Sequence, residues 1–246
     1  MRRNGSDGIR KISTAYAREC MGKIKVNLEF LSVDNDYQCI MVSSSVAGEG
    51  KSTITANLAV SHAASQKKTL LLDADLRRPT QHRHFDLVNG EGLSDIILSG
   101  CDWRKFVVKT TIPYLHIITA GRIPPNPAEL LGSRRMSEMI REMKNEYDFI
   151  LVDTSPILLV PDPVSMSKHV DGIILVARYN YTTIPNLVNT KQQLQLVGKP
   201  VIGAILNKTV QAKNQYGYGY QEYLCGSHSN SRICKPQAAP ARQAGK

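Results

Sequence analysis

Residues 45–53 read Ser45-Val46-Ala47-Gly48-Glu49-Gly50-Lys51-Ser52-Thr53 and are the most informative segment of the chain. A phosphate-binding loop needs small residues whose backbone N–H groups converge on a phosphate, a lysine that reaches the phosphate oxygens, and a hydroxyl residue that holds magnesium. Serine stands where the pattern usually begins with glycine. A short apolar strand is expected before the loop and a helix from 51 to about 65 after it. This context favours a nucleotide-phosphate site over a chance glycine-rich turn.

The rest of the chain alternates apolar runs with amphipathic segments. The runs are apolar throughout, as in strands that are covered on both faces. They predict an α/β fold of the P-loop NTPase type, a mostly parallel sheet with helices on both faces. We expect an N-terminal helix and lead-in over 1–36, with the helix itself from 10 to about 31, a P-loop domain over 37–210, and a flexible tail over 211–246. The expected strands are 39–43, 69–73, 115–119, 149–153, 172–177 and 200–206.

Composition narrows the function classes. The net charge is +10, but no block of five basic residues occurs, so we expect no nucleic-acid partner. The sequence has neither a run of about 18 apolar residues nor a signal-like start, which predicts a cytoplasmic chain. The five cysteines, and the pair His82 and His84, lack metal-ligand spacing. We therefore expect reduced thiols and structural histidines.

Acidic residues follow two of the expected strands. Asp73 and Asp75 leave the strand at 69–73, and Asp153 ends the strand at 149–153. The carboxyl ends of parallel strands meet at one edge of a sheet, where ligands bind. One carboxylate there could help to hold hydrated magnesium, and another could accept a proton from an attacking hydroxyl. Aspartate also caps helices, so the residues alone leave both interpretations open.

The tail carries a tyrosine cluster in a glycine-interrupted stretch that is unlike core sequence. Composition alone leaves two interpretations open, a set of phosphate acceptors and a merely flexible aromatic tail. The cluster consists of Tyr216, Tyr218, Tyr220 and Tyr223.

Together these features resemble the bacterial tyrosine kinases of the capsule and exopolysaccharide family, CpsD/CapB-like and in their stand-alone cytoplasmic form. The resemblance runs from about residue 15 to residue 223. It implies a protein tyrosine kinase that uses ATP, phosphorylates its own tail and regulates capsular or exopolysaccharide synthesis and export. The motifs that carry it are residues 48–53, Asp73-Ala74-Asp75-Leu76-Arg77-Arg78-Pro79, Pro124-Pro125-Asn126-Pro127-Ala128-Glu129-Leu130-Leu131, Asp153-Thr154-Ser155-Pro156 and the tyrosine cluster.

The resemblance also implies roles for single residues. Asp73 would draw the proton from a substrate tyrosine, and Asp75 and Asp153 would be the magnesium-side carboxylates, although the division between Asp73 and Asp75 stays open. Arg77 matches the arginine of the second motif, and Asn207 matches an adenine-contacting position. Lys51 would be catalytic with the three aspartates. ATP would be bound by Gly48, Glu49, Gly50, Lys51, Ser52 and Thr53, and Mg²⁺ by Ser52, Asp75 and Asp153.

The partners that the resemblance implies are a transmembrane activator, which is also the polysaccharide chain-length regulator, and a cognate phosphotyrosine phosphatase. Further copies of the chain would phosphorylate the tail in trans. The activator would place the chain at the inner face of the cell membrane.

The sequence departs from the family at two places. Many members have proline where this chain has Ala47. The N-terminal Glu-x-x-Arg-x-x-Arg motif used in ring assembly is reduced to Glu19, Gly22 and Lys25, so assembly would have to use Arg18 or Lys23 instead.

Two other function classes compete with the kinase. Partitioning or site-selection ATPases of the MinD and ParA group carry a signature lysine near the start of the loop, where this chain has Val46. They also lack the Arg-Arg-Pro segment and the tyrosine tail. A nucleotide-bound scaffold without kinase activity is the second alternative, and the intact Lys51, Asp73, Asp75 and Asp153 argue against it.

Overall fold

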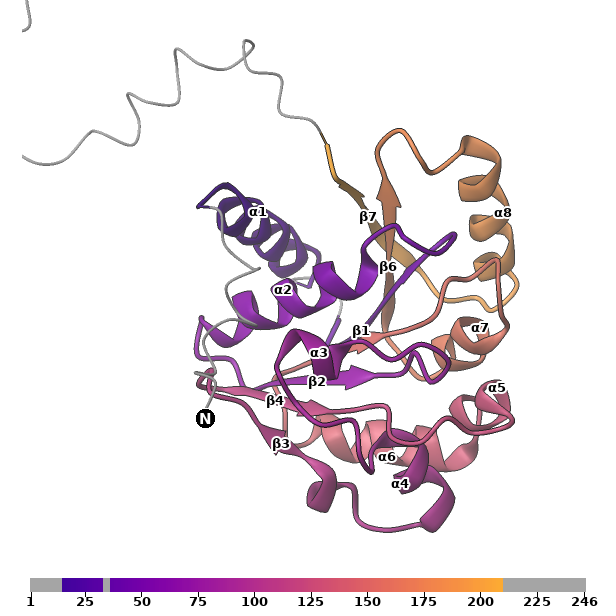
Figure 1. The fold of residues 1–246 in the computed structure, drawn as a ribbon. Helices are drawn as coiled ribbons and strands as arrows, with labels where there is room; N and C mark the ends of the chain where they lie inside the picture. The colour runs from indigo at the N-terminus through magenta and orange to yellow at the C-terminus, as the bar shows by residue number, and fades with distance from the viewer. Residues whose placement is uncertain (1–14, 33–35, 210–246) are drawn as a thin grey trace, which may run out of the picture. The chain divides into compact units, whose positions relative to one another are not determined.

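The structure is a computed structural model that describes residues 15–32 and 36–209. Its centre is a seven-stranded sheet in the order β3-β4-β2-β5-β1-β6-β7 (Figure 1). All neighbouring strands run parallel except β3, which pairs antiparallel with β4. The strands are β1 (Cys39–Ser44), β2 (Thr69–Asp73), β3 (Val108–Lys109), β4 (Leu115–Ile118), β5 (Phe149–Asp153), β6 (Gly172–Arg178) and β7 (Val201–Asn207).

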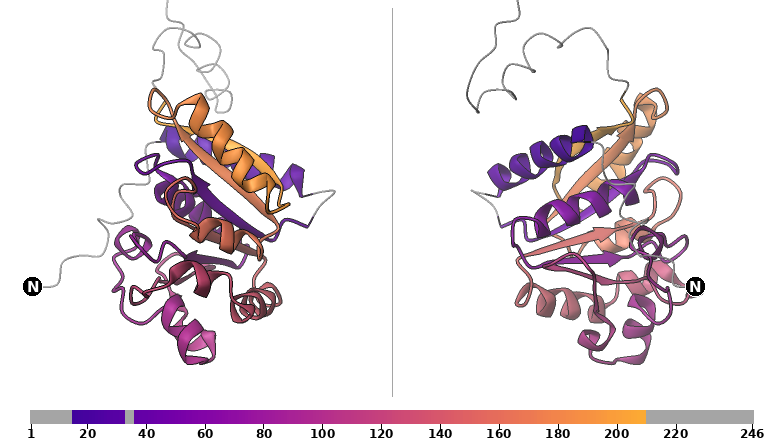
Figure 2. Two further views of the ribbon diagram at one scale, coloured as in Figure 1. Left: turned by 90° about the vertical axis from the view of Figure 1, so that its right-hand side faces the viewer. Right: turned by 60° about the vertical axis from the view of Figure 1, so that its left-hand side comes forward.

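Helices cover both faces of the sheet (Figure 2). Alternate residues of each strand point to opposite faces, so β1 packs Ile40 with Leu58 of α2 on one face and Met41 with Met139 of α6 on the other. The helical segments are α1 (Ala15–Leu31), α2 (Lys51–Ala63), α3 (Gln81–His84), α4 (Leu93–Ser99), the 3₁₀ turn η2 (Trp103–Phe106), α5 (Pro127–Leu131), α6 (Arg134–Lys144), α7 (Asp162–Ser167) and α8 (Ile184–Gln195).

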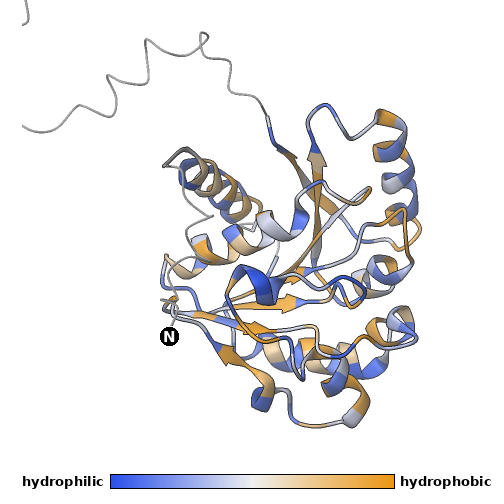
Figure 3. Cartoon of the chain, viewed as in Figure 1, coloured by the Kyte–Doolittle hydropathy of each residue, from blue (hydrophilic) through white to orange (hydrophobic). Residues whose placement is uncertain are grey.

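The hydropathy of the strands explains this layering. Figure 3 shows the apolar colour gathered on the strands, while the helices carry it on one side only. α6 is an example, since it buries Met136, Met139, Ile140 and Met143 and its Ser133 N-cap accepts a hydrogen bond from the N–H of Met136. An apolar stripe of that spacing is typical of a helix packed on a sheet.

The predicted fold class is confirmed, and all six expected strands are present. The expected N-terminal helix is present from Ala15 to Leu31, while residues 10–14 lie outside the described residues. The antiparallel strand β3 was not expected, because a two-residue strand carries no periodic pattern. Within the described ranges, no helix is long and apolar enough to cross a membrane.

Candidate functional site

The phosphate loop connects β1 to α2. Two of its glycines take positive φ angles, 82° at Gly48 and 91° at Gly50, a region that other residues disfavour. A Cβ atom on Gly50 would lie 2.2 Å from Nδ2 of Asn207, so a side chain here would displace the Asn207 amide. Gly50 is also the N-cap of α2. The positive end of that helix therefore faces the loop and favours an anion there.

The carbonyl groups of the loop are bound by neighbouring strands and loops. The Tyr181 hydroxyl donates to the Ala47 carbonyl over 3.1 Å, and Nδ2 of Asn207 donates to the Glu49 carbonyl over 2.9 Å. Within the described part of the chain, the N–H groups of residues 47–50 donate to no protein acceptor. The loop thus offers a set of free donors, which is what a bound phosphate requires.

Glu49 shapes the loop from within. Its side chain is fully buried, and its Oε2 accepts a hydrogen bond from the N–H of Val46 over 2.9 Å. Its Oε1 accepts a hydrogen bond from the Thr182 hydroxyl. The carboxylate is therefore engaged inside the protein, and the backbone of Glu49 is the part that remains for a nucleotide.

Lys51 lies between two of the predicted carboxylates. Its Nζ is 2.8 Å from Oδ2 of Asp75, 3.6 Å from Oδ1 of Asp153 and 3.1 Å from the Ser52 hydroxyl. Burial disfavours the charged form of Lys51, but the charges of Asp153 and Asp75 outweigh burial and raise its pKa. The lysine keeps its positive charge at neutral pH, next to the helix end that faces the loop.

Asp73 and Asp153 are register partners on β2 and β5, and both are fully buried. Oδ2 of Asp73 accepts the N–H groups of Thr80 (3.1 Å) and Gln81 (2.9 Å), and Oδ2 of Asp153 accepts Nε2 of Gln81 over 2.7 Å. The Oδ1 atom of each aspartate has no hydrogen-bond partner. Burial, followed by the charge of Asp153, raises the pKa of Asp73 to about 8.

Asp75 differs from these two carboxylates because both of its oxygens are occupied. Oδ2 contacts Lys51, and Oδ1 accepts the Ser155 hydroxyl over 2.8 Å and the N–H of Arg78 over 3.1 Å. The sequence left the roles of Asp73 and Asp75 open. In this structure Asp75 anchors the loop lysine, whereas Asp73 keeps an open oxygen.

The residues at this edge of the sheet fit a magnesium ion bound together with a nucleotide. Among the described residues, no group of three or more His, Cys, Asp or Glu side chains could hold a metal by itself. Mg²⁺ in nucleotide sites takes most of its ligands from phosphates and water and only one or two from carboxylates. The Oδ1 atom of Asp153 meets that demand, because it is buried without the hydrogen-bond partner that buried polar atoms normally have.

Arg77 and Asn207 lie at the border of the site. Arg77 donates from Nε to Oδ2 of Asp162 over 2.7 Å and from a terminal nitrogen to Oδ1 over 3.1 Å. Asp162 is fully buried in the first turn of α7, so it fixes the plane of the Arg77 guanidinium. Asn207 ends β7 and contacts the loop, as described above. Thr53 follows Ser52 in the first turn of α2 and is exposed.

The structure therefore brings together the loop, Lys51, the three aspartates and Asn207. Sequence reasoning missed Gln81, Asp162 and Tyr181. Each acts through a contact with a residue far away in the chain, as the pair of Gln81 and Asp153 shows. None of the three belongs to a motif, so no local signal could have found them.

Two expectations from the sequence concern the ends of the chain. The tyrosine cluster at 216–223 lies outside the described residues. In α1, Glu19 forms an ion pair with Lys23 at 2.9 Å, one helical turn away. Lys25 contacts Glu29 at 3.9 Å and the Ser65 hydroxyl. Lys23 and Lys25 thus each contact an acidic side chain of the same helix.

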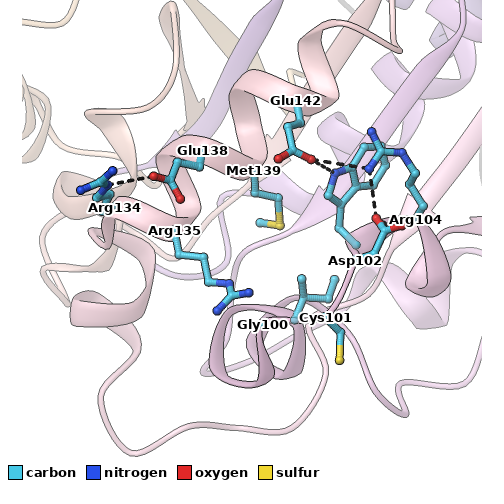
Figure 4. A pocket seen from close by; sticks show the side chains of 11 residues that line it. Gly100, Cys101, Asp102, Arg104, Arg134, Arg135, Glu138, Met139 and Glu142 are labelled. Carbon is cyan, nitrogen blue, oxygen red and sulfur yellow. Dashed lines mark hydrogen bonds and ion pairs between the residues drawn. The ribbon is translucent and has the colours of Figure 1, made fainter.

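A separate hollow of about 710 Å³ lies between α4, η2 and α6 (Figure 4). None of the predicted site residues lines it. Arg134 pairs with Glu138 at 2.8 Å, and Arg104 lies 3.5 Å from Glu142. Because its lining contains as many acidic as basic side chains, the hollow has no charge preference for a phosphate.

The chain is similar to bacterial tyrosine kinases both in sequence and in structure. A family model described as an AAA domain matches residues 37–202. The tyrosine-protein kinase YwqD of Bacillus subtilis (strain 168) is 41% identical over 196 residues, which are 79% of this chain and 83% of that protein. The kinase domain of the Escherichia coli tyrosine kinase ETK superposes with a TM-score of 0.77 at 32% identity, covering 83% of this chain and 80% of that domain.

The competing ATPase class shares only the fold. The septum site-determining protein MinD of Pyrococcus horikoshii OT3, complexed with Mg-ADP, superposes with a TM-score of 0.61 at 24% identity over 72% of each chain. Identity that low shows a shared fold and nothing more specific.

Proposed function

The chain belongs to the bacterial tyrosine kinases of the capsule and exopolysaccharide family, and on that premise we propose that it transfers the γ-phosphoryl group of ATP to the hydroxyl of a protein tyrosine. The hydroxyl oxygen forms the new P–O bond, the bond between the γ-phosphorus and the bridging oxygen breaks, and ADP leaves. The proton of the hydroxyl is taken up by a base. The observation that carries the proposal is the set of free loop donors, Lys51 and the three aspartates at one edge of the sheet.

The contacts of each group indicate its role in phosphate binding, magnesium binding or proton uptake. The N–H groups of residues 47–50 and the ammonium of Lys51 would hold the phosphates. Bound Mg²⁺ would neutralise the charge on the β- and γ-phosphate oxygens. Ser52 and Asp153 would hold that ion, and Asp75, whose oxygens are bound by Lys51, Ser155 and Arg78, would act on it only through water. Asp73 would take the tyrosine proton at Oδ1, the oxygen that has no partner in the protein.

Burial and the charge of Asp153 raise the pKa of Asp73 to about 8, so its ionised form would accept a proton near neutral pH more strongly than an ordinary aspartate. A carboxylate with an ordinary pKa would be ionised throughout this range but would accept the proton only weakly. The charges of Mg²⁺ and of Lys51 would favour the ionised form of Asp73 once the nucleotide is bound. Catalysis would otherwise come from positioning and charge neutralisation, as phosphoryl transfer generally requires.

We further propose that the acceptors include the chain's own tail. Tyr216, Tyr218, Tyr220 and Tyr223 would be phosphorylated by a neighbouring copy. A transmembrane activator, acting as the polysaccharide chain-length regulator, would hold the chain at the inner face of the membrane. A phosphotyrosine phosphatase would reverse the modification. Family membership and the composition of the tail support these proposals.

Labelled ATP tests the transfer. The purified chain, with and without the cytoplasmic segment of a membrane partner, should carry label on tyrosine, and Lys51→Met should abolish it. Label that never appears on tyrosine, or that survives Lys51→Met, would contradict the proposal. A variant with phenylalanine at all four tail positions should lose most of the label, and retention would place the acceptors elsewhere.

The partitioning class makes the opposite prediction. ATP hydrolysis that DNA or lipid stimulates, without any phosphotyrosine, would favour that class. Val46 at the signature-lysine position speaks against it.

A further inference from the structure

Gln81 is the first residue of the short helix α3 and is fully buried. It contacts two of the carboxylates at once. Its backbone N–H donates to Oδ2 of Asp73 over 2.9 Å, and its Nε2 donates to Oδ2 of Asp153 over 2.7 Å. The same Nε2 donates to the carbonyl of Ser52 over 3.0 Å, in the first turn of α2. One residue thus joins β2, β5 and the helix that follows the phosphate loop.

The orientation of the Gln81 amide follows from its partners. Oδ2 of Asp153 and the Ser52 carbonyl are both acceptors, so the NH₂ group must face them. The amide oxygen, Oε1, then faces away and is buried without a partner. It joins the Oδ1 atoms of Asp73 and Asp153 as buried acceptors that no protein donor satisfies.

These contacts leave each of the two aspartates with one bound oxygen and one oxygen without a hydrogen-bond partner. In both carboxylates the oxygen bound to Gln81 is Oδ2, and the oxygen left without a partner is Oδ1. We propose that Gln81 is a positioning residue, whose side-chain amide holds Asp153 so that its Oδ1 faces the magnesium-bound nucleotide and its water ligands, while its backbone N–H leaves Oδ1 of Asp73 open beside it. The water ligands of Mg²⁺ would donate to Oδ1 of Asp153 and to Oε1 of Gln81.

Removal of the Gln81 amide would free Asp153 to rotate about its Cβ–Cγ bond. Its Oδ1 is already 3.6 Å from Nζ of Lys51, so the freed carboxylate could turn to form a closer ion pair with the lysine. Oδ1 of Asp153 would then bind Lys51 and would no longer be available to the water ligands of Mg²⁺. Residues that orient metal ligands typically change metal affinity by about 10- to 100-fold when they are replaced.

The inference rests on the nucleotide part of the proposed function, and ADP binding tests it without any phosphoryl transfer. The dissociation constant of ADP is measured for the full chain by calorimetry, once with excess Mg²⁺ and once with EDTA. The dissociation constant in EDTA divided by the dissociation constant with Mg²⁺ reports how strongly the ion couples to the nucleotide. Gln81→Met keeps the length and volume of the side chain and removes both polar groups.

We expect Gln81→Met to lower this ratio by about 10- to 100-fold, with the affinity in EDTA unchanged. Gln81→Asn keeps the amide but is one methylene too short to reach Asp153, so it should show the same loss. Gln193→Met, on the exposed side of α8, is the matched control and should behave as wild type.

An unchanged ratio in Gln81→Met would overturn the proposal. So would an equal loss of ADP affinity in EDTA, or loss of the melting transition in both Gln81 variants, since either would make Gln81 a structural residue. If wild type couples Mg²⁺ to ADP but never labels tyrosine, the kinase proposal fails while the role of Gln81 stands.

Discussion

Gly50→Ala is the change whose cost the structure predicts in most detail. The substitution forces alanine into a φ of 91°, a left-handed conformation that costs about 1–2 kcal/mol for a residue with a side chain. The new Cβ atom would also lie 2.2 Å from Nδ2 of Asn207 and displace it. The hydrogen bond from Asn207 to the Glu49 carbonyl would be lost, which costs about 1 kcal/mol. The free energy of unfolding should therefore fall by about 2–3 kcal/mol.

A double-mutant cycle with Asn207→Ala separates these two contributions. Asn207→Ala alone should cost about 1 kcal/mol, because it removes the same hydrogen bond. The double variant should then be about as stable as Gly50→Ala alone, since the bond is lost only once. Gly22→Ala is the control, because a Cβ atom at Gly22 would meet nothing within 4 Å. It sits inside α1 and should stabilise the chain by about 0.5–1 kcal/mol.

Urea unfolding, followed by circular dichroism, measures all four variants, and ADP calorimetry measures the loop. Gly50→Ala should weaken ADP binding, because the loop donors can no longer converge, and Gly22→Ala should not. A loss of less than about 0.5 kcal/mol for Gly50→Ala would contradict this prediction, because ordinary surface substitutions cause changes of that size. Additive losses in the cycle would show that Gly50 and Asn207 act independently.

Three further predictions concern residues outside the motifs. Burial lowers the pKa of His62 from its ordinary 6.5 to about 3, so in mild acid His62 binds a proton in the unfolded chain but not in the folded one. The free energy of unfolding should therefore fall as the pH drops below 6.5, by about 2 kcal/mol at pH 5. Urea unfolding across this pH range should show a smaller fall in His62→Phe. Asp162→Asn removes the carboxylate that binds Arg77, so the free energy of unfolding should fall by about 1–2 kcal/mol. Unfolding midpoints measure this loss, and Asp162→Glu is the comparison. Tyr181→Phe removes one hydrogen bond to the loop carbonyl of Ala47, and ADP calorimetry should show a loss of a few fold, with unchanged affinity as the refuting result.

Much of the fold and of the site could be predicted from local sequence. The apolar runs predicted the strands because a strand buried on both faces can tolerate few polar residues. The glycines and Lys51 predicted the loop because the conformation and the charge are properties of those residues themselves. Asp73, Asp75 and Asp153 could be placed together because the carboxyl ends of parallel strands share one edge of the sheet.

The order of the strands and the state of each carboxylate needed the tertiary structure. Nothing in β2 or β5 alone shows that Asp73 and Asp153 would be register partners. The difference between Asp75, with both oxygens bound, and Asp73, with one left open, depends on donors from other segments, such as Ser155 and Gln81.

Residue types and short spacings therefore suffice to predict the phosphate loop, the parallel sheet and the three carboxylates at its ligand-binding edge. The open oxygens, the contacts of Gln81 with two of the carboxylates and the orientation of Arg77 by Asp162 are visible only in the folded chain. Those contacts join segments 72 and 85 residues apart. Hydrogen bonds over such separations depend on how the chain packs, and packing leaves no periodic mark on the sequence.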